Sequence, residues 1–241
     1  MTRIRRRWWI PGILLILVVV LVLGGFLTSR ARCWQWVGTP VCRVETSEKI
    51  VALTFDDGPT PEGVDYFLQT LTPEGTKATF FLTGADLVAD PGQARRLVAA
   101  GHQIANHSYR HERMWGLFPD AYEGDIRDTD ALLRREGGDA ALLFRPPYGK
   151  KLTGLPIALA RTGHRTIMWD IEDPETSDPK AFSDQVLKQV RPGSIILIHA
   201  MYRRRDTARR ALPLILTGLK DRGYRAVTMS ELLRLEQPGT N

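Results

Sequence analysis

The chain has 241 residues, of which 43% are hydrophobic and 25% charged, enough apolar material for one globular domain with a full core. This composition excludes a disordered chain, and two cysteines are too few for a small disulfide scaffold. The net charge of +6 at first suggests a nucleic-acid partner, but residues 1–43 hold seven arginines and no acidic residue. The other 26 basic and 27 acidic residues nearly cancel, so we expect no nucleic-acid binding by the main domain.

An uncharged segment of 22 residues, 8–29, follows four arginines near the N-terminus. At about 1.5 Å per residue, some 20 helical residues cross a hydrocarbon core of about 30 Å. The larger arginine cluster precedes the segment, which predicts a cytoplasmic tail at 1–7, an uncleaved transmembrane signal anchor at 8–29, and a periplasmic or cell-surface remainder. The alternative is a cleavable signal peptide, whose apolar part would be shorter and followed by a small-x-small site.

Residues 30–47 are predicted to form an extracytoplasmic linker that contains both cysteines, Cys33 and Cys42. An oxidising compartment predicts a disulfide between them, whereas in a cytosolic protein they would be two free thiols. As a flexible coil, a linker of this length would span roughly 20–25 Å r.m.s.. The domain that follows is therefore expected to work close to the membrane.

Residues 48–236 alternate short apolar runs with amphipathic ones, ahead of a short tail at 237–241. The apolar runs are bounded by Gly or Pro and rich in Ile, Val, Phe and Thr, as strands are. They lie at 50–55, 78–82, 102–105, 142–144, 166–169, 194–198 and 225–227. This alternation predicts the α/β class, with about seven parallel strands in an open sheet or a distorted (β/α) barrel.

Helix signals fall between the predicted strands. Asp90-Pro91 and Asp178-Pro179 each indicate an N-cap followed by proline at the first helical position. Residues 207–220 repeat apolar side chains at helical spacing. Thr228, three residues before a glutamate, predicts a capping box for the last helix.

Polar side chains appear where five of the predicted strands end. In a parallel α/β barrel these carboxyl ends share one rim, and active sites lie there. Asp56 and Asp57 follow the first strand, and Gly58-Pro59 enforces a turn. One carboxylate can bind a metal while the other acts as a general base. In isolation, the same four residues are also typical of a turn with a helix N-cap.

His107 and His111 follow the third strand four residues apart, so on a helical turn they would share one face. With Asp57 they make two imidazoles and one carboxylate, which leaves coordination positions open and suits a catalytic metal. His-x-x-x-His alone is more often structural. His102 and His164 each follow a glycine at the start of a strand, away from the rim, and we interpret both as structural.

Three further strand ends carry polar groups, at Arg145, at the segment 169–173 that closes the fifth strand, and at His199. Arg145 stands beside two prolines, in a stiff loop that can aim a backbone N–H as an oxyanion hole requires, although a solvated cation is the alternative. His199 ends the sixth strand and is a candidate site residue or a buried core histidine. The basic tract at 203–210 is a solvated face, or it contacts an anionic substrate or lipid headgroups.

In this order, the motifs Thr-Phe-Asp-Asp-Gly-Pro, His-Ser-x-x-His, Arg-Pro-Pro-Tyr-Gly and Leu-x-His resemble the polysaccharide deacetylases of carbohydrate esterase family 4, the NodB-homology domain. Four motifs in order are far more specific than any one alone, and the match covers about 49–235. The resemblance implies a distorted (β/α) barrel that uses one divalent metal ion, usually zinc, to remove N- or O-acetyl groups from polysaccharides.

The resemblance also implies a role for each matched residue. It implies a catalytic base at Asp56, metal ligands at Asp57, His107 and His111, a residue that orients the base at Arg145, and a general acid at His199. It further implies an oxyanion donor at the Tyr148 backbone N–H and a substrate-binding wall from Pro147, Tyr148 and Leu197.

The fourth motif departs from the family pattern, which often has Asp three residues after the Trp of the fifth strand and a second Trp four residues further on. Glu172 and Thr176 stand at these positions. We expect Glu172 to pair with Arg145, with Asp173 and Glu175 as competitors. Without the second Trp, part of the usual groove wall is missing, which affects the substrate more than the chemistry.

Together, the resemblance and the predicted anchor imply a membrane-bound hydrolase of linear amides. Its acetylated substrate would be an envelope or secreted amino-sugar polysaccharide that loses N-acetyl groups. Three alternatives stay open: an O-acetyl carbohydrate esterase, an amidohydrolase that acts on a non-carbohydrate, and a non-catalytic glycan-binding module on the same barrel. The residues indicate no particular oligomeric state.

Overall fold

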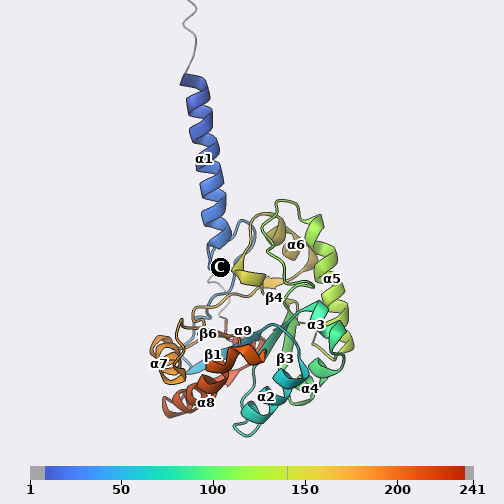
Figure 1. Ribbon diagram of the computed structural model, residues 1–241, viewed down its shortest axis with the longest axis vertical. Helices are drawn as coiled ribbons and strands as arrows, with labels where there is room; N and C mark the ends of the chain where they lie inside the picture. Colours follow the sequence, from blue (N-terminus) through green and yellow to red (C-terminus); the bar gives the residue numbers. More distant parts are fainter. Residues whose placement is uncertain (1–8, 140, 237–241) are drawn as a thin grey trace, which may run out of the picture.

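The computed structural model describes residues 9–139 and 141–236, and Figure 1 shows a long N-terminal helix standing above an α/β domain. The predicted cytoplasmic tail at 1–7, Trp8 and the predicted tail at 237–241 lie outside the described residues.

Seven parallel strands in the described residues form one sheet, in the order β5-β4-β3-β2-β1-β6, and β7 pairs with the first half of β1. The α/β class predicted from the alternation of strands and helices is confirmed. The strands are β1 (Ile50–Asp56), β2 (Thr79–Leu82), β3 (Gln103–Asn106), β4 (Leu143–Phe144), β5 (Arg165–Thr166), β6 (Ile195–Ile198) and β7 (Arg225–Val227).

Strand β1 is central to the sheet, and all seven of its residues are buried. Its second half pairs with β2 on one side, where Asp56 lies opposite Phe81, and with β6 on the other, where Phe55 lies opposite Ile198. A parallel strand covered on both faces needs such a continuous apolar run. The register places the residues that follow β1 and β6 at the same edge of the sheet.

The sheet curls into an incomplete barrel. Strands β4 and β5 have only two residues each, and beyond β5 the chain forms isolated parallel bridges, Val41 with Ile167 and Ile171 with Ile196. The bridge from Ile171 reaches β6, the opposite end of the strand order. This loose closure agrees with the predicted distorted barrel and brings the strand ends around one rim.

Helices lie around the outside of the curled sheet (Figure 1). The largest apolar cluster joins β1 and β2 to the helices, with Phe55, Phe67 and Phe80 in mutual aromatic contact at its centre. The helices are α1 (Trp9–Arg30), α2 (Pro61–Leu71), α3 (Gly84–Ala89), α4 (Gln93–Ala99), α5 (Asp120–Arg135), α6 (Gly154–Thr162), α7 (Pro179–Gln189), α8 (Asp206–Asp221) and α9 (Met229–Leu233).

Two of the three predicted helix N-caps are confirmed. Asp178 caps α7 by accepting a hydrogen bond from the Lys180 N–H, and Thr228 caps α9 in the same way from Glu231. The helix start predicted at Asp90 is wrong, because Asp90 follows the last residue of α3 and α4 begins only at Gln93. Between them Gly92 has a φ of 82°, a left-handed conformation that breaks the helical path.

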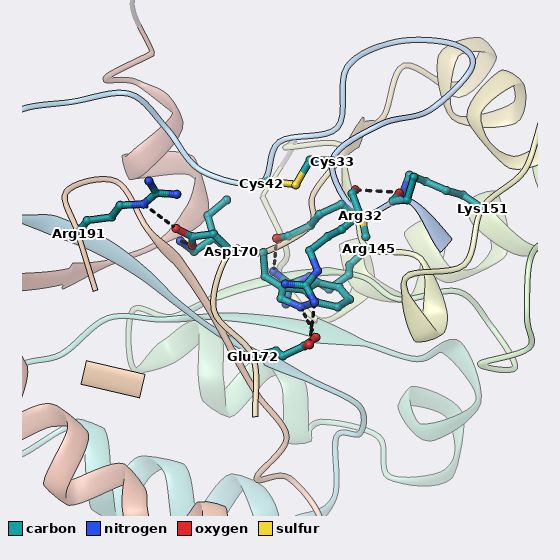
Figure 2. The surroundings of a disulfide bond; sticks show 12 residues. Arg32, Cys33, Cys42, Arg145, Lys151, Asp170, Glu172 and Arg191 are labelled. Atoms are coloured by element: carbon teal, nitrogen blue, oxygen red, sulfur yellow. Dashed lines mark hydrogen bonds and ion pairs between the residues drawn. A yellow bond between two sulfur atoms is a disulfide. The ribbon is translucent and has the colours of Figure 1, made fainter. Parts of the chain in front are cut away.

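Helix α1 is long and apolar enough to cross a membrane, and all its residues except Ser29 are at least partly exposed. The linker that follows is not the flexible coil expected from its length. Val41 and Arg43 form bridges to Ile167 and Ser194 of the domain. Cys33 and Cys42 form a disulfide (Figure 2). Because these contacts fold the linker onto the domain, its reach as a random chain does not apply.

His102 is buried, and neither ring nitrogen has a hydrogen-bond partner among the described residues, in agreement with a structural role. Burial, with the charge of Lys77, lowers its pKa from 6.5 to about 4.

The unfolded chain therefore binds a proton at His102 near pH 6.5 that the folded chain takes up only near pH 4. As the pH falls through this window, the free energy of unfolding is expected to drop by up to about 3 kcal/mol. Urea denaturation of His102→Leu should show a smaller loss than the wild type; an equal loss would contradict this origin.

Candidate active site

A cavity of about 610 Å³ lies at the rim where β1, β3 and β6 end. Asp56 and Asp57 reach it from β1, His107 and His111 from the loop after β3, and His199 from the end of β6. Residues up to 143 positions apart are gathered because parallel strands end at one edge. The structure thus brings together the two carboxylates and three histidines that the motifs singled out.

Asp56 is nearly inaccessible and forms a buried ion pair with Arg145, whose Nη1 lies 2.6 Å from Oδ1 of Asp56. Arg145 is held from several directions, since it also donates to the Thr54 hydroxyl and the Met168 carbonyl and lies over the Phe81 ring. Burial alone would raise the pKa of Asp56, but the charges of Arg145, His107 and His199 lower it overall. Asp56 is therefore an ionised carboxylate at neutral pH.

Asp57, His107 and His111 each present one donor atom, and these three atoms lie within 4.8 Å of one another. Nε2 of His111 lies 3.3 Å, and Nε2 of His107 4.0 Å, from Oδ1 of Asp57. Two imidazoles and one carboxylate form a donor set used for divalent transition metals, with coordination positions left for water or substrate.

The surroundings of His107 fit a metal ligand. Its Nδ1 lies 2.8 Å from the Arg145 carbonyl, and a carbonyl only accepts, so Nδ1 carries the proton and Nε2 presents its lone pair to the cavity. An outer hydrogen bond that fixes the tautomer is typical of metal-bound histidine. Burial, with the repulsion that a protonated His107 would add, lowers the pKa of His111, which favours its neutral, metal-binding form. The residues present therefore fit a divalent cation.

The two histidines do not share a helical turn, as their spacing suggested. Ser108 and His111 have φ values of 67° and 57°, so the chain after β3 is an irregular loop. Local side chains stabilise it: the Ser108 N–H donates to Asn106, and the His111 N–H donates to the Ser108 hydroxyl. These turns, rather than a helix, direct both imidazoles at Asp57.

His199 is supported by Asp173, a partner that sequence reasoning considered only for Arg145. Nδ1 of His199 lies 2.9 Å from Oδ2 of Asp173, and the His199 N–H also donates to this carboxylate. Burial alone would lower the pKa of His199, but the hydrogen bond with Asp173 and the nearby charges of Asp56, Asp173 and Asp57 raise it. A histidine with a raised pKa is suited to donate a proton.

The expected pairing of Glu172 with Arg145 is wrong for the described residues. Glu172 instead accepts hydrogen bonds from Trp169 Nε1 at 2.6 Å and from Arg32 of the linker at 2.7 Å (Figure 2). The guanidinium of Arg32 also lies 5.2 Å from the Trp169 ring centre. Arg145 is enclosed between β1 and the segment after β5. Its charge is neutralised there by Asp56, and Glu172 lies elsewhere, bonded to Trp169 and Arg32.

The predicted substrate-binding residues have different positions. Tyr148 is half-exposed at the cavity, with its ring 4.7 Å from that of His111 and a left-handed backbone at φ 56°. Leu197 lines the cavity from β6, whereas Pro147 is buried and is not among the residues that line it. In the basic tract, Arg204 and Arg205 line the cavity and Arg209 is buried, paired with Glu62.

The profile of the polysaccharide deacetylase family matches residues 43–167. The chain is 33% identical to a peptidoglycan-N-acetylglucosamine deacetylase of Bacillus cereus, over 79% of this chain and 91% of that protein. It is also 33% identical to a chitooligosaccharide deacetylase of Sinorhizobium fredii, over 76% of this chain and 92% of that one. A third relative, the peptidoglycan-N-acetylmuramic acid deacetylase PdaC of Bacillus subtilis, is 33% identical over 78% of this chain, which spans 40% of its length.

Solved structures agree with the sequence matches. A peptidoglycan N-acetylglucosamine deacetylase superposes with a TM-score of 0.74 at 31% identity, over 79% of this chain and 91% of that one. A CE4 family pseudoenzyme from Bacillus anthracis superposes with a TM-score of 0.72 at 27% identity, over 80% and 68%. The chain belongs to the polysaccharide deacetylase family and is an enzyme of that class, as the four motifs implied.

Proposed function

We propose that this enzyme hydrolyses N-acetyl groups on an amino-sugar polysaccharide of the cell envelope. The observation that supports this best is the meeting of an ionised Asp56 and an Asp173-supported His199 at one cavity beside three metal-type donors. Relatives named for peptidoglycan N-acetylglucosamine and for chitooligosaccharides favour an amino-sugar substrate. A fold alone would not select this activity, because the same fold serves a pseudoenzyme.

Asp57, His107 and His111 would hold the divalent cation, with zinc as the proposed ion for this donor set. When bound, such an ion supplies Lewis acidity, which polarises an acetyl carbonyl and lowers the pKa of water. Asp56, kept ionised by Arg145, accepts the proton of the attacking water. His199, whose pKa is raised with the help of Asp173, donates a proton to the leaving amine of the sugar.

Two further residues position the acetyl group in this proposal. The left-handed turn at Tyr148 exposes a backbone segment at the cavity, and its N–H would donate to the developing oxyanion. Leu197 offers an apolar wall for the acetyl methyl, since it lines the cavity from the buried strand β6. Glu172 belongs to the groove wall, where it connects Trp169 to Arg32, rather than to the acid-base machinery.

We also propose that α1 anchors the enzyme in a membrane, with the domain on the extracytoplasmic side. Its length, apolar composition and exposure support this, as do the arginines that precede it in the sequence. The Cys33–Cys42 disulfide fits an oxidising compartment. Envelope glycans are then the acetylated polymers nearest to the site.

The substrate is tested by acetate release from full-length enzyme in detergent. N-acetylglucosamine oligomers, peptidoglycan and acetylxylan are offered side by side, with the Asp56→Asn variant as the blank. We expect release from one or both N-acetylated substrates. Release of acetate from acetylxylan alone would contradict the proposal and indicate an O-acetyl esterase. No release from any of the substrates in the presence of zinc would favour a glycan-binding module.

The Asp173–His199 pair predicts a pH effect. Asp173→Asn removes the carboxylate that helps to raise the pKa of His199, so that pKa should fall. His199 would lose its proton at a lower pH, and the alkaline limb of the profile of kcat/KM against pH should move to lower pH. Asp170→Asn is the matched control, because Asp170 lies on the same segment but bonds Ser194 and Ile195 instead. An unshifted limb in Asp173→Asn would contradict the assignment of His199 as the acid.

A further inference from the structure

Five large apolar side chains are exposed at the end of the domain that faces α1. Trp34 and Trp36 come from the linker, and Trp115, Leu117 and Phe118 from the loop between β3 and α5. Phe118 is 76% exposed, the largest value for any bulky apolar side chain in the described residues. We call these five side chains the membrane-facing surface. Such a cluster is costly in water and marks a binding surface.

A groove of about 680 Å³ places this surface beside α1. It is lined by α1 residues from Val20 to Ser29 and by Trp36, Trp115 and Leu117. These α1 residues cover about 14 Å of helix at about 1.5 Å per residue. If α1 crosses a hydrocarbon core of about 30 Å, its second half lies in the outer leaflet. Trp115 and Leu117 then lie at the depth of that leaflet.

The domain cannot easily swing away from this position, because the end of α1 is bonded to it. The buried Lys151 ammonium donates to the carbonyls of Ala31 at 2.6 Å and Arg32 at 3.1 Å (Figure 2). The same segment holds the apolar loop: Lys151 forms a bridge with Met114, and the Gly154 N–H donates to the Gly116 carbonyl. The segment 151–154 thus contacts both the end of α1 and the apolar loop, and it fixes the position of the loop along the axis of α1.

Cations accompany the apolar side chains. Arg30 ends α1, Arg113 lies in the loop two residues before Trp115, and Lys150 adjoins Lys151. Within the described part of the chain, none of Arg30, Arg113 and Lys150 forms an ion pair with an acidic side chain. Burial, with the charges of Arg30 and Arg113, lowers the pKa of Lys150. Aromatic side chains beside unpaired cations are the composition found at membrane interfaces.

We propose that the membrane-facing surface inserts into the outer interface of the bilayer that α1 crosses, with Arg30, Arg113 and Lys150 at the phosphates of anionic lipids. This inference rests on the anchor proposed above. Lipid is the occupant because the groove runs along α1, which lipid would surround in the proposed anchor. The guanidinium of Arg113 lies 4.5 Å from the Tyr148 ring centre, so the surface also adjoins the catalytic cavity. Insertion would hold that cavity at a fixed, short distance from the membrane and select glycans near the lipid surface.

The test uses full-length protein in vesicles of phosphatidylcholine and phosphatidylglycerol, with a nitroxide spin label on one introduced cysteine. Both native cysteines are in the disulfide, so the new thiol is labelled selectively. Phe118→Cys probes the surface. Leu214→Cys is the matched control, an exposed apolar position on α8 at the far end of the domain (Figure 1). Val20→Cys reports on α1 itself. The label's accessibility to oxygen, which concentrates in lipid, is compared with that to a water-soluble nickel chelate.

We expect the Phe118 label to favour oxygen severalfold over the nickel chelate, as the Val20 label does, and the Leu214 label to favour nickel. A Phe118 label that behaves like Leu214 while Val20 stays in lipid would overturn the inserted surface and leave the anchor standing. A water-exposed Val20 label would overturn both. Spin–spin broadening at Phe118 would show a second copy of the chain on the surface and contradict a lipid occupant. An equal oxygen preference in vesicles without phosphatidylglycerol would overturn the role of the three cations.

Discussion

Asp56→Asn is expected to lower kcat by about 10²–10⁴-fold, the usual contribution of a general acid-base group, while the fold and the bound metal are retained. Asparagine has nearly the same shape and can still accept the hydrogen bond from Arg145, but it cannot take a proton from water. Acetate release from a saturating acetylated oligomer measures kcat, and elemental analysis measures the metal content.

Arg145→Gln distinguishes loss of the base from loss of stability. It would leave the Asp56 carboxylate buried without its cation, and breaking such a pair costs about 3–5 kcal/mol. Asp56→Asn breaks the same pair, but the Arg145 guanidinium keeps its hydrogen bonds to the Thr54 hydroxyl and the Met168 carbonyl, whereas Arg145→Gln removes these as well. We therefore expect both variants to unfold at a lower denaturant concentration than the wild type, and Arg145→Gln at the lowest. Near-wild-type turnover in a folded Asp56→Asn variant would show that another group accepts the proton.

His107→Ala and His111→Ala are expected to remove most of the bound metal and with it the activity. Each variant deletes one of three donors, so the loss of affinity should exceed the roughly 10–100-fold that accompanies loss of a group that only orients a ligand. Zinc titration of the metal-free protein with a competing chelator measures the affinity directly, without relying on turnover.

His164→Gln is the matched control for these two variants. His164 is also a buried histidine beside an aspartate, Asp130, but it lies outside the cavity. Its substitution should leave zinc affinity unchanged. Wild-type zinc affinity in both His107→Ala and His111→Ala would contradict the proposed ligand set, as would an equal loss in His164→Gln.

The class of the fold and most of the candidate site can be inferred from local patterns in the chain. Strand β1 is recognisable because a parallel strand buried on both faces must be apolar throughout, and Asp56 and Asp57 then stand out as carboxylates directly at its end. The same contrast between a short apolar run and a polar end marks His107, Arg145 and His199. Since the carboxyl ends of parallel strands share one rim, chain order alone implies that these residues meet.

The partner of each acidic side chain, in contrast, depends on the folded path of the backbone. Glu172 and Asp173 are adjacent, yet one bonds Trp169 and Arg32 and the other His199. Neighbouring residues in an irregular segment point in directions that depend on the path of the backbone, and no periodic pattern records that path. The loop that directs His107 and His111 is similar, because its left-handed residues are stabilised by Asn106 and Ser108 rather than by helix propensity.

The contacts of the linker with the domain could not be predicted from local pattern either. Its composition is typical of a short flexible linker. In the structure, however, Val41 and Arg43 form backbone bridges with the domain, and Arg32 donates a hydrogen bond to Glu172. Such contacts join residues more than 100 positions apart. They depend on the curled sheet, because its shape leaves backbone groups of Ile167 and Ser194 available to pair with the linker. The chemistry at the strand ends could therefore be inferred from local pattern, whereas the attachment of α1 and the partners of Glu172 and Asp173 depend on long-range packing.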